Sequence, residues 1–250
     1  MTDRHDASTK KPRPFAESLR RGVLIGAAAL ALVIPVALHF APHGAKPATT
    51  PPQHEIRHAD FGAEAASPDA RRLANWVTDS RDNATHSFVV LDKREAKVFL
   101  FDRNGRLQAA TPTVIGSAIG DDLYPGVGDK PLSELKPYER TTPAGRFVAE
   151  LGETASRHED VVWVDYDSAT SMHRIIKVPE RLNAIATPDP ADNRLSNGCI
   201  NLPDAFYEKS LRPAVDHDGV VVYILPETRA VQQTFASFYD VDAPPKLAQQ

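Results

Sequence analysis

The distribution of hydrophobic and polar positions divides the chain into three regions. Residues 22–41 form an apolar run without a formal charge. Leu73, Trp76 and Val77 repeat at the spacing of one helix face. From residue 86 onward, short apolar segments alternate with polar positions and turn residues at the period of a β-strand. The pattern therefore predicts a membrane-spanning helix, a short amphipathic helix and a domain of short strands.

The apolar run reads GVLIGAAALALVIPVALHFA. As a helix it would be about 30 Å long, the thickness of the hydrocarbon core of a bilayer. Residues 1–21 before it are polar and basic, which favours a cytoplasmic tail. We therefore expect residues 22–41 to be an uncleaved signal anchor in the inner membrane, with all later residues in the periplasm. A cleaved signal peptide and a secreted product are the alternative, although Leu38, His39 and Phe40 crowd the cleavage position.

Two accessory segments precede the strand-rich region. Residues 42–66 are rich in proline, alanine and threonine, which is typical of a linker. Within residues 67–85, Ser67, Pro68 and Asp69 provide an N-cap, a proline in the first turn and an acidic residue at the positive end of a helix. We expect this accessory helix to pack against the main domain.

Residues 86–226 are expected to form that main domain. The segments SFVVLD and KVFLFD, four residues apart, predict a β-hairpin. A short helix is predicted at 204–211 with Asp204 as its cap, and residues 227–250 are expected to be a tail with a short helix at its start. The predicted strands are 87–92, 97–102, 107–116, 146–150, 161–166, 171–178 and 219–225. About seven short strands and few helices indicate a mainly β domain, sandwich or barrel-like.

Composition narrows the possible partners and metal sites. A formal net charge of −4 gives no electrostatic footprint for nucleic acid, and 42% hydrophobic residues can fill a core. The single cysteine excludes an intrachain disulfide and any multi-cysteine metal site. His54 and His58 have the spacing of a helical zinc pair, but no helix pattern and no third ligand accompany them. We therefore expect no metal site.

The single cysteine lies in the stretch LSNGCINLP, residues 195–203. Gly198, directly before it, removes a side chain where a substrate would approach and permits backbone angles closed to other residues. Cys199 is therefore either a nucleophile or, like most free cysteines, a small buried hydrophobe. This stretch alone leaves both interpretations open.

Three motifs occur in the order typical of one enzyme family. Thr142–Phe147 reads TPAGRF, His173 lies on a predicted strand, and Ser196–Asn201 reads SNGCIN. Over roughly residues 86–226, this combination resembles the L,D-transpeptidase (YkuD-type) catalytic domain of bacterial cell-wall enzymes. The resemblance implies a YkuD-like fold with Cys199 as the nucleophile and His173 as the general base.

The resemblance also implies a reaction on peptidoglycan. Cys199 would attack the L-to-D peptide bond of a tetrapeptide stem, and a thioester would form as the terminal D-residue leaves. An amine on a neighbouring stem, or on a tethered protein, would then take the acyl group. Neither a metal nor an organic cofactor is implied. The partners would be stem peptides and, through the anchor, the inner membrane; the oligomeric state stays open.

The residue types fit this chemistry independently. A free thiol with a pKa near 8.5 is only about 3% thiolate at pH 7, so Cys199 needs a base or a cationic partner. His173 is the candidate base, and a satisfied core histidine is the alternative. Gly198, Asn197 and Ser196 are expected to form a turn in which the backbone N–H of Cys199 contributes to an oxyanion hole.

Four further residues are candidate substrate contacts: Asn201, Arg194, Tyr124 and Arg140. Arginine binds carboxylates in a bidentate manner, so both arginines, together with Tyr124, are candidates for the carboxylates of the peptide. Solvated surface charge is the alternative for each. Asn201 and Ser196 could also shape the turn through local hydrogen bonds.

The sequence departs from the family pattern at two points. Asn197 occupies a position where the family usually has histidine, and asparagine cannot take a proton near neutral pH. His173 precedes Cys199 by 26 positions, several more than usual, so residues 179–194 are interpreted as an inserted loop. This loop and a second one at residues 121–141 are expected to border the substrate groove.

Three other functions stay open. The same thioester could pass to water, which would make the protein an L,D-carboxypeptidase or murein peptide hydrolase. Asn197 motivates a catalytically inactive peptidoglycan-binding module. Ser133 and Lys136 fit the Ser-x-x-Lys pattern of the penicillin-binding class, but no Lys-Thr-Gly follows and Ser133 lies in a proline-flanked loop.

Overall fold

The computed structural model describes residues 55–154 and 158–243. The predicted cytoplasmic tail, the signal anchor and the first part of the linker lie outside these residues. Within the described ranges, no helix is long and apolar enough to cross a membrane. The anchor at residues 22–41 therefore stays a prediction from the sequence.

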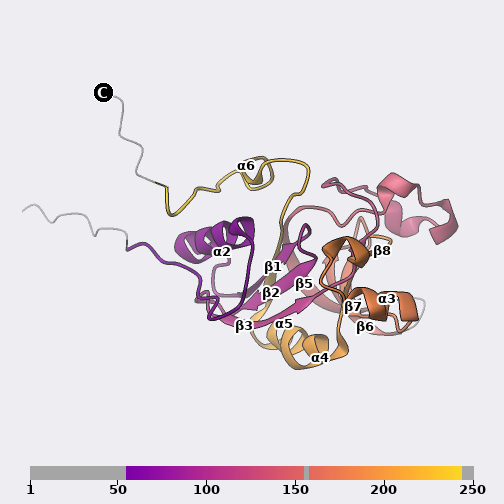
Figure 1. Cartoon of the computed structure of the whole chain (residues 1–250), viewed down its shortest axis with the longest axis horizontal. Coiled ribbons are helices and arrows are strands. Elements are labelled where there is room, and N and C mark those ends of the chain that lie inside the picture. The colour runs from indigo at the N-terminus through magenta and orange to yellow at the C-terminus, as the bar shows by residue number, and fades with distance from the viewer. Residues whose placement is uncertain (1–54, 155–157, 244–250) are drawn as a thin grey trace, which may run out of the picture. The chain divides into compact units, whose positions relative to one another are not determined.

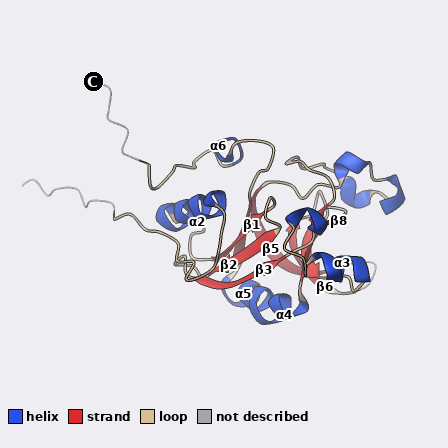
Figure 2. Cartoon of the chain, in the orientation of Figure 1, coloured by secondary structure: helices blue, strands red, loops and turns tan. Residues whose placement is uncertain are grey.

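A sheet forms the centre of the domain, as Figures 1 and 2 show. It has eight strands. Its strand order is β3-β2-β1-β10-β5-β6-β7-β9, and a separate pair joins β4 to β8. Most neighbours are antiparallel, whereas β1–β10, β7–β9 and β4–β8 are parallel. The strands are β1 (Ser87–Asp92), β2 (Lys97–Phe101), β3 (Leu107–Pro112), β4 (Ile115–Gly116), β5 (Gly145–Glu153), β6 (Asp160–Asp165), β7 (Thr170–Arg174), β8 (Arg194–Ser196), β9 (Ile200–Leu202) and β10 (Val220–Ile224). The predicted mainly β fold and its first hairpin are confirmed.

The two edges of this sheet are joined by a short bridge. Val114, two residues after β3, exchanges both backbone hydrogen bonds with Asn201 of β9, at 3.0 and 2.8 Å. The Thr113 hydroxyl adds a bond of 2.7 Å to the Asn201 carbonyl. The sheet therefore comes close to a closed barrel, in agreement with the barrel-like alternative of the sequence analysis.

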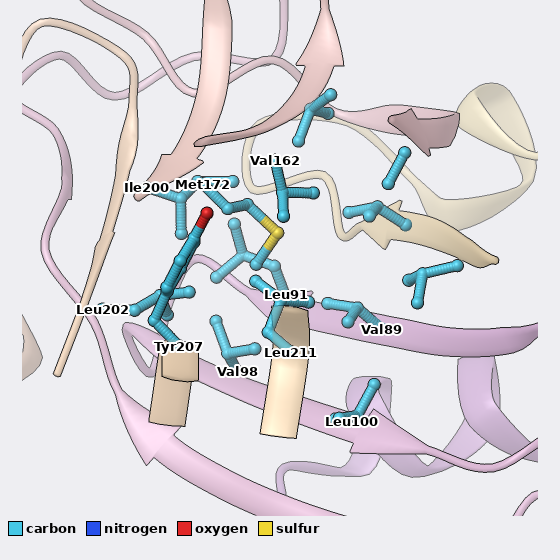
Figure 3. Packing of buried hydrophobic residues seen from close by; sticks show 14 of the residues in the cluster. Val89, Leu91, Val98, Leu100, Val162, Met172, Ile200, Leu202, Tyr207 and Leu211 are labelled. Carbon is cyan, nitrogen blue, oxygen red and sulfur yellow. The ribbon is translucent and has the colours of Figure 1, made fainter. Parts of the chain in front are cut away.

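Alternate residues of the central strands enter two different apolar clusters. Val89 and Leu91 of β1 belong to an inner cluster, whereas Phe88 and Val90 face the opposite side of the sheet. Figure 3 shows the inner cluster, in which Met172, Val162 and Ile200 lie opposite Tyr207 and Leu211. Because β1, β2 and β10 are buried on both faces, their sequences are apolar runs rather than strict alternations.

Helices cover both faces of the central strands. α2 (Pro68–Ser80) begins at Ser67, whose side chain accepts a hydrogen bond from the Ala70 N–H, and it packs Leu73, Trp76 and Val77 on the outer cluster. The predicted accessory helix is thus confirmed. On the other face lie α4 (Asp204–Phe206), a π-helical turn η5 (Tyr207–Leu211) and α5 (Arg212–Asp218). The remaining short helices are α3 (Pro179–Ala184), α6 (Val231–Thr234), η1 (Val127–Asp129), η2 (Leu132–Glu134), η3 (Pro137–Glu139) and η4 (Pro190–Asn193).

Several predicted boundaries differ from the structure. The linker was expected to extend to residue 66, but Phe61 is buried between Phe99 and Phe101, which attaches residues 55–66 to the domain. The tail was expected from residue 227, yet Phe235 and Val241 are buried in the outer cluster. In both segments, single apolar side chains bury themselves in the domain, and the overall composition of the segment does not predict this.

Two predicted elements also need correction. The strand expected at 107–116 is interrupted after β3, because Thr113 and Val114 leave β2 to pair with Asn201. Asp204 is the first helical residue of α4 rather than its cap; the cap is Pro203, and the Asp204 carboxylate forms an ion pair with Lys177. The continuous helix from 204 to 218 is longer than expected, since α5 follows η5 directly.

Candidate active site

The parallel register of β7 and β9 determines which side chains share the site. Met172 pairs with Ile200 and His173 with Asn201. Met172 and Ile200 point into the inner cluster, so the neighbouring positions face the opposite side. There His173 and Asn201, together with Cys199 and Ser171, line a pocket of about 390 Å³. Adjacent parallel strands thus bring the predicted nucleophile and base into one cavity.

The turn before Cys199 requires glycine. Gly198 has φ +125°, which L side chains rarely adopt, and a Cβ there would lie 2.8 Å from the Thr141 carbonyl oxygen. The Thr142 hydroxyl donates a hydrogen bond of 2.8 Å to the Gly198 carbonyl and accepts one of 2.9 Å from the Gly116 N–H. The threonine of the TPAGRF motif therefore connects β4 to the turn that presents the cysteine.

Ser196 and Asn201 fix the other side of this turn. The Ser196 hydroxyl donates to the Cys199 carbonyl at 2.6 Å and accepts from the Gly198 N–H at 3.1 Å. The Asn201 amide donates to the same Cys199 carbonyl at 3.3 Å. Both side chains are buried and bonded to the chain itself, so they act as supports of the turn. Asn197 is half-buried and lines the pocket.

The half-buried thiol lies among polar groups. Its S–H donates to the Ala169 carbonyl, with the sulfur 3.4 Å from the oxygen, and the Ser171 hydroxyl donates to the sulfur at 3.7 Å. Burial raises the pKa of the Cys199 thiol, but the hydrogen bond and charge of His173, with the Ser171 backbone and hydroxyl, more than offset burial and hold this pKa below its ordinary value. These interactions therefore favour the thiolate form of Cys199.

The orientation of His173 suits a base. Its Nδ1 lies 2.7 Å from the Arg174 carbonyl oxygen. Because a carbonyl can only accept, Nδ1 carries the hydrogen and the neutral ring keeps Nε2 as an acceptor. Cys199 can transfer its proton to that nitrogen. A thiol with a lowered pKa and an imidazole with a free acceptor can together perform nucleophilic attack on a carbonyl group.

Arg181 of α3 is a pocket residue that the sequence analysis did not identify. Its Nη1 donates to the Asn201 side-chain oxygen at 2.6 Å and its Nη2 to the Leu195 carbonyl at 3.2 Å. The inserted loop at 179–194 therefore borders the pocket through this arginine. The available signal was a basic residue in the insertion between His173 and Cys199.

Three of the expected substrate contacts lie elsewhere. Arg194 is paired with the carboxylate of Glu227 and donates to the Lys93 carbonyl, outside the pocket lining. Tyr124 packs against Tyr138 and lines a separate small cavity next to Asn197. Arg140 is half-buried and also does not line the pocket. The partners of Arg194 are far from it in the sequence, so spacing along the chain does not predict where this side chain lies.

The loop at residues 121–141 borders the pocket through Leu132 of η2. Its Gly126 N–H donates to the Asp167 carbonyl in the turn between β6 and β7, at 3.0 Å. Ser133, in the same turn as Leu132, is exposed. Across residues 55–154 and 158–243, no group of three or more histidine, cysteine or acidic side chains is arranged to hold a metal ion; His58 contacts Asp242 instead.

Neither a family model nor a curated protein matches this chain. Solved structures do. An L,D-transpeptidase from Enterococcus faecium shares 21% identity over 56% of this chain and 50% of its own, with a TM-score of 0.33. The helical cell shape determining protein Pgp2 from Campylobacter jejuni shares 18% identity, over 58% of this chain and 48% of its own, with a TM-score of 0.36. The L,D-transpeptidase LdtMt1 in complex with imipenem shares 18% identity, over 56% and 58%, with a TM-score of 0.33.

The match spans about half the length of the first two of these proteins. Two of these solved structures bear the name of the family that the three motifs resemble.

Proposed function

We propose that this protein is an L,D-transpeptidase that acts on peptidoglycan stem peptides. The observation that carries the proposal is the placement of His173 on β7 and of Cys199 directly before the adjacent parallel strand β9, where both line one pocket and the pKa of the thiol is lowered. The ordered motifs around these two residues point to this family among the cysteine acyltransferases.

The reaction has two acyl-transfer steps. His173 takes the thiol proton, and the sulfur of Cys199 attacks the carbonyl carbon of the L-to-D peptide bond. The C–N bond breaks, His173 returns the proton to the leaving D-residue's amine, and a thioester remains. An acceptor amine then attacks the thioester, the C–S bond breaks, and the thiol is regenerated when the amine's proton passes through His173. No step requires an oxidant or a reductant.

The oxyanion of each tetrahedral intermediate needs hydrogen-bond donors. The backbone N–H of Cys199 is the proposed donor, because the Gly198 turn fixes the orientation of the peptide unit between them. Asn197 at the rim supplies hydrogen-bonding capacity without proton transfer. Since His173 already accepts the thiol proton, the family's usual histidine at position 197 is not needed as a base in this scheme.

We further propose that the catalytic domain works in the periplasm. The support is the uncharged run at residues 22–41 with a basic segment before it. The proposed substrate, peptidoglycan, also lies outside the cytoplasm, so the proposed location of the domain matches that of its substrate.

The test is intact-mass spectrometry of the full chain in mild detergent after incubation with a carbapenem, alongside Cys199→Ala and His173→Ala. We expect one covalent adduct that Cys199→Ala abolishes and His173→Ala slows. Muropeptide products then define the acceptor: a cross-linked dimer supports transfer, whereas a shortened monomer alone would replace the transpeptidase with an L,D-carboxypeptidase. Absence of any adduct on a reduced thiol, together with binding to cell-wall sacculi, would instead indicate an inactive binding module.

A further inference from the structure

We propose that Arg181 binds a carboxylate group of the peptide next to the scissile bond. This inference rests on the proposed function and specifies the substrate class of the same site: peptides that carry a free carboxylate on one of the two residues joined by the bond.

The arginine is held in place by the turn that carries the nucleophile. Its two side-chain hydrogen bonds go to Asn201 and to the Leu195 carbonyl, which lie on either side of Cys199 in the sequence. Asn201 is itself fixed by its backbone bonds to Val114. A guanidinium has five N–H donors, and these two contacts leave others free to bind a ligand in the pocket.

The charge of Arg181 is not neutralised within the described part of the chain. Its two partners are neutral oxygens, and no carboxylate of a described residue forms an ion pair with it. Nearby arginines differ: Arg174 pairs with Asp160 and Glu208, and Arg194 pairs with Glu227. Burial lowers the pKa of Arg181, and the opposing influence of the charges of Cys199 and Glu180, neither of which is bonded to the guanidinium, does not offset it. An incoming carboxylate would supply the missing counter-charge.

The pocket offers an anion one favourable position. Among the described residues that line it, Arg181 is the one lysine or arginine, and Glu159 is the one acidic residue. Glu159 is exposed, whereas Arg181 is half-buried beside Asn201. A carboxylate entering the pocket is therefore attracted towards Arg181, which is bonded to residues on either side of Cys199, and this places the neighbouring carbonyl carbon near the sulfur.

Two carboxylates of a stem peptide could satisfy this chemistry. One is the C-terminal carboxylate of the leaving D-residue, and the other is a side-chain carboxylate on the residue before the scissile bond. Three synthetic stems distinguish them: a stem with both groups free, a stem with a C-terminal amide and a stem with the side-chain carboxylate amidated.

The experiment measures kcat/KM for the three peptides with the full-length parent protein, Arg181→Gln and Arg181→Lys. Arg72→Gln, on the exposed surface of α2, is the control for loss of a positive charge. The rate of Cys199 alkylation by iodoacetamide is measured in each variant and used to normalise kcat/KM for thiol reactivity. The parent is expected to prefer the free stem over one of the two amides by about tenfold or more, as for a charge-assisted hydrogen bond.

Arg181→Gln should lose this preference, Arg181→Lys should retain part of it, and Arg72→Gln should keep it in full. The peptide that reveals the preference identifies the carboxylate. Three results would each overturn the inference. The first is an equal fall in kcat/KM of Arg181→Gln on all three peptides, and the second is a fall that disappears after normalisation by the alkylation rate. The third is a parent enzyme that shows no preference among the peptides. A parent protein inactive on every stem and without a thioester would instead refute the proposed function.

Discussion

The Thr142 hydroxyl donates a hydrogen bond of 2.8 Å to the carbonyl of Gly198, the residue directly before the nucleophile. Thr142 is buried, and its replacement by valine would leave that carbonyl and the Gly116 N–H without their partner. We expect Thr142→Val to lower the free energy of unfolding by about 1–3 kcal/mol and to reduce acylation of Cys199. Thr142→Ser, which keeps the hydroxyl, should restore both. Chemical denaturation and intact-mass kinetics measure the two effects.

A second prediction concerns the backbone of the turn. Gly198→Ala would place a Cβ 2.8 Å from the Thr141 carbonyl at a positive φ, so the turn must move and Cys199 with it. We expect a folded protein whose acylation rate falls by about a hundredfold or more, the scale of a misplaced reacting group. Gly62→Ala is the matched control, because Gly62 also has a positive φ but open space around it. Comparable activity loss in both variants would contradict the prediction.

The lowered pKa of Cys199 predicts the pH dependence of its reactivity. The thiolate is the reactive form, so the iodoacetamide rate should rise with pH and reach half its maximum at a lower pH than for the same thiol without these interactions. His173→Ala removes the largest of the interactions that favour the thiolate, so the midpoint should move upward. Ser171→Ala should move it upward by less. A midpoint that does not respond to His173→Ala would remove His173 from its proposed role.

A buried ion pair near the site should support stability. Lys93 and Asp121 are both almost fully buried, with Nζ 2.8 Å from Oδ1, and the lysine also donates to the Gly120 and Thr142 carbonyls. Asp121→Asn leaves Glu227, 3.6 Å away, as the remaining carboxylate beside the buried ammonium, so we expect the free energy of unfolding to fall by about 3 kcal/mol, the lower end for a broken buried pair. Asp122→Asn, at an exposed position, should cost less than about 1 kcal/mol.

The same carboxylate predicts acid sensitivity. Burial raises the pKa of Asp121, but hydrogen bonds from Lys93, Thr228 and the Glu227 N–H outweigh burial and leave this pKa well below its usual range. The native state then binds fewer protons than the unfolded chain, whose aspartates titrate near 3.9. Stability contributed by Asp121 is present above about pH 4 and is lost as the pH falls below it. Urea unfolding at pH 7 and pH 3 should therefore show a smaller pH effect in Asp121→Asn than in the parent.

The sequence predicted local features better than long-range contacts. The first hairpin and the start of α2 follow from period-two alternation and from capping residues, which are local properties. Cys199 and His173 were identified from motifs with a known order. Their shared pocket follows from the pairing of β7 with β9, the strand that begins directly after Cys199. Arg181 was missed because its role depends on how the inserted loop folds back, which no local pattern records.

Arg194 and Phe61 also have contacts that the sequence did not predict. Arg194 was a reasonable contact for a carboxylate, but the carboxylate it finds is Glu227, 33 residues away in the chain. Phe61 lies in a stretch whose composition is typical of a linker, but it is buried against Phe99 and Phe101 of β2. Pairings of this kind depend on the whole arrangement of strands and become visible only in three dimensions.

The bridge between Val114 and Asn201 has a consequence for how the protein loses activity. Because β9 is bonded to β7 on one side and to Val114 on the other, the strand after the nucleophile has no free edge from which to fray. The amide protons of Ile175 and Asn201, which bond to β9 or to the bridge, should exchange with solvent only when the sheet opens as one cooperative unit. Cys199 would then lose its activity through global unfolding of the domain and not through local opening of β9.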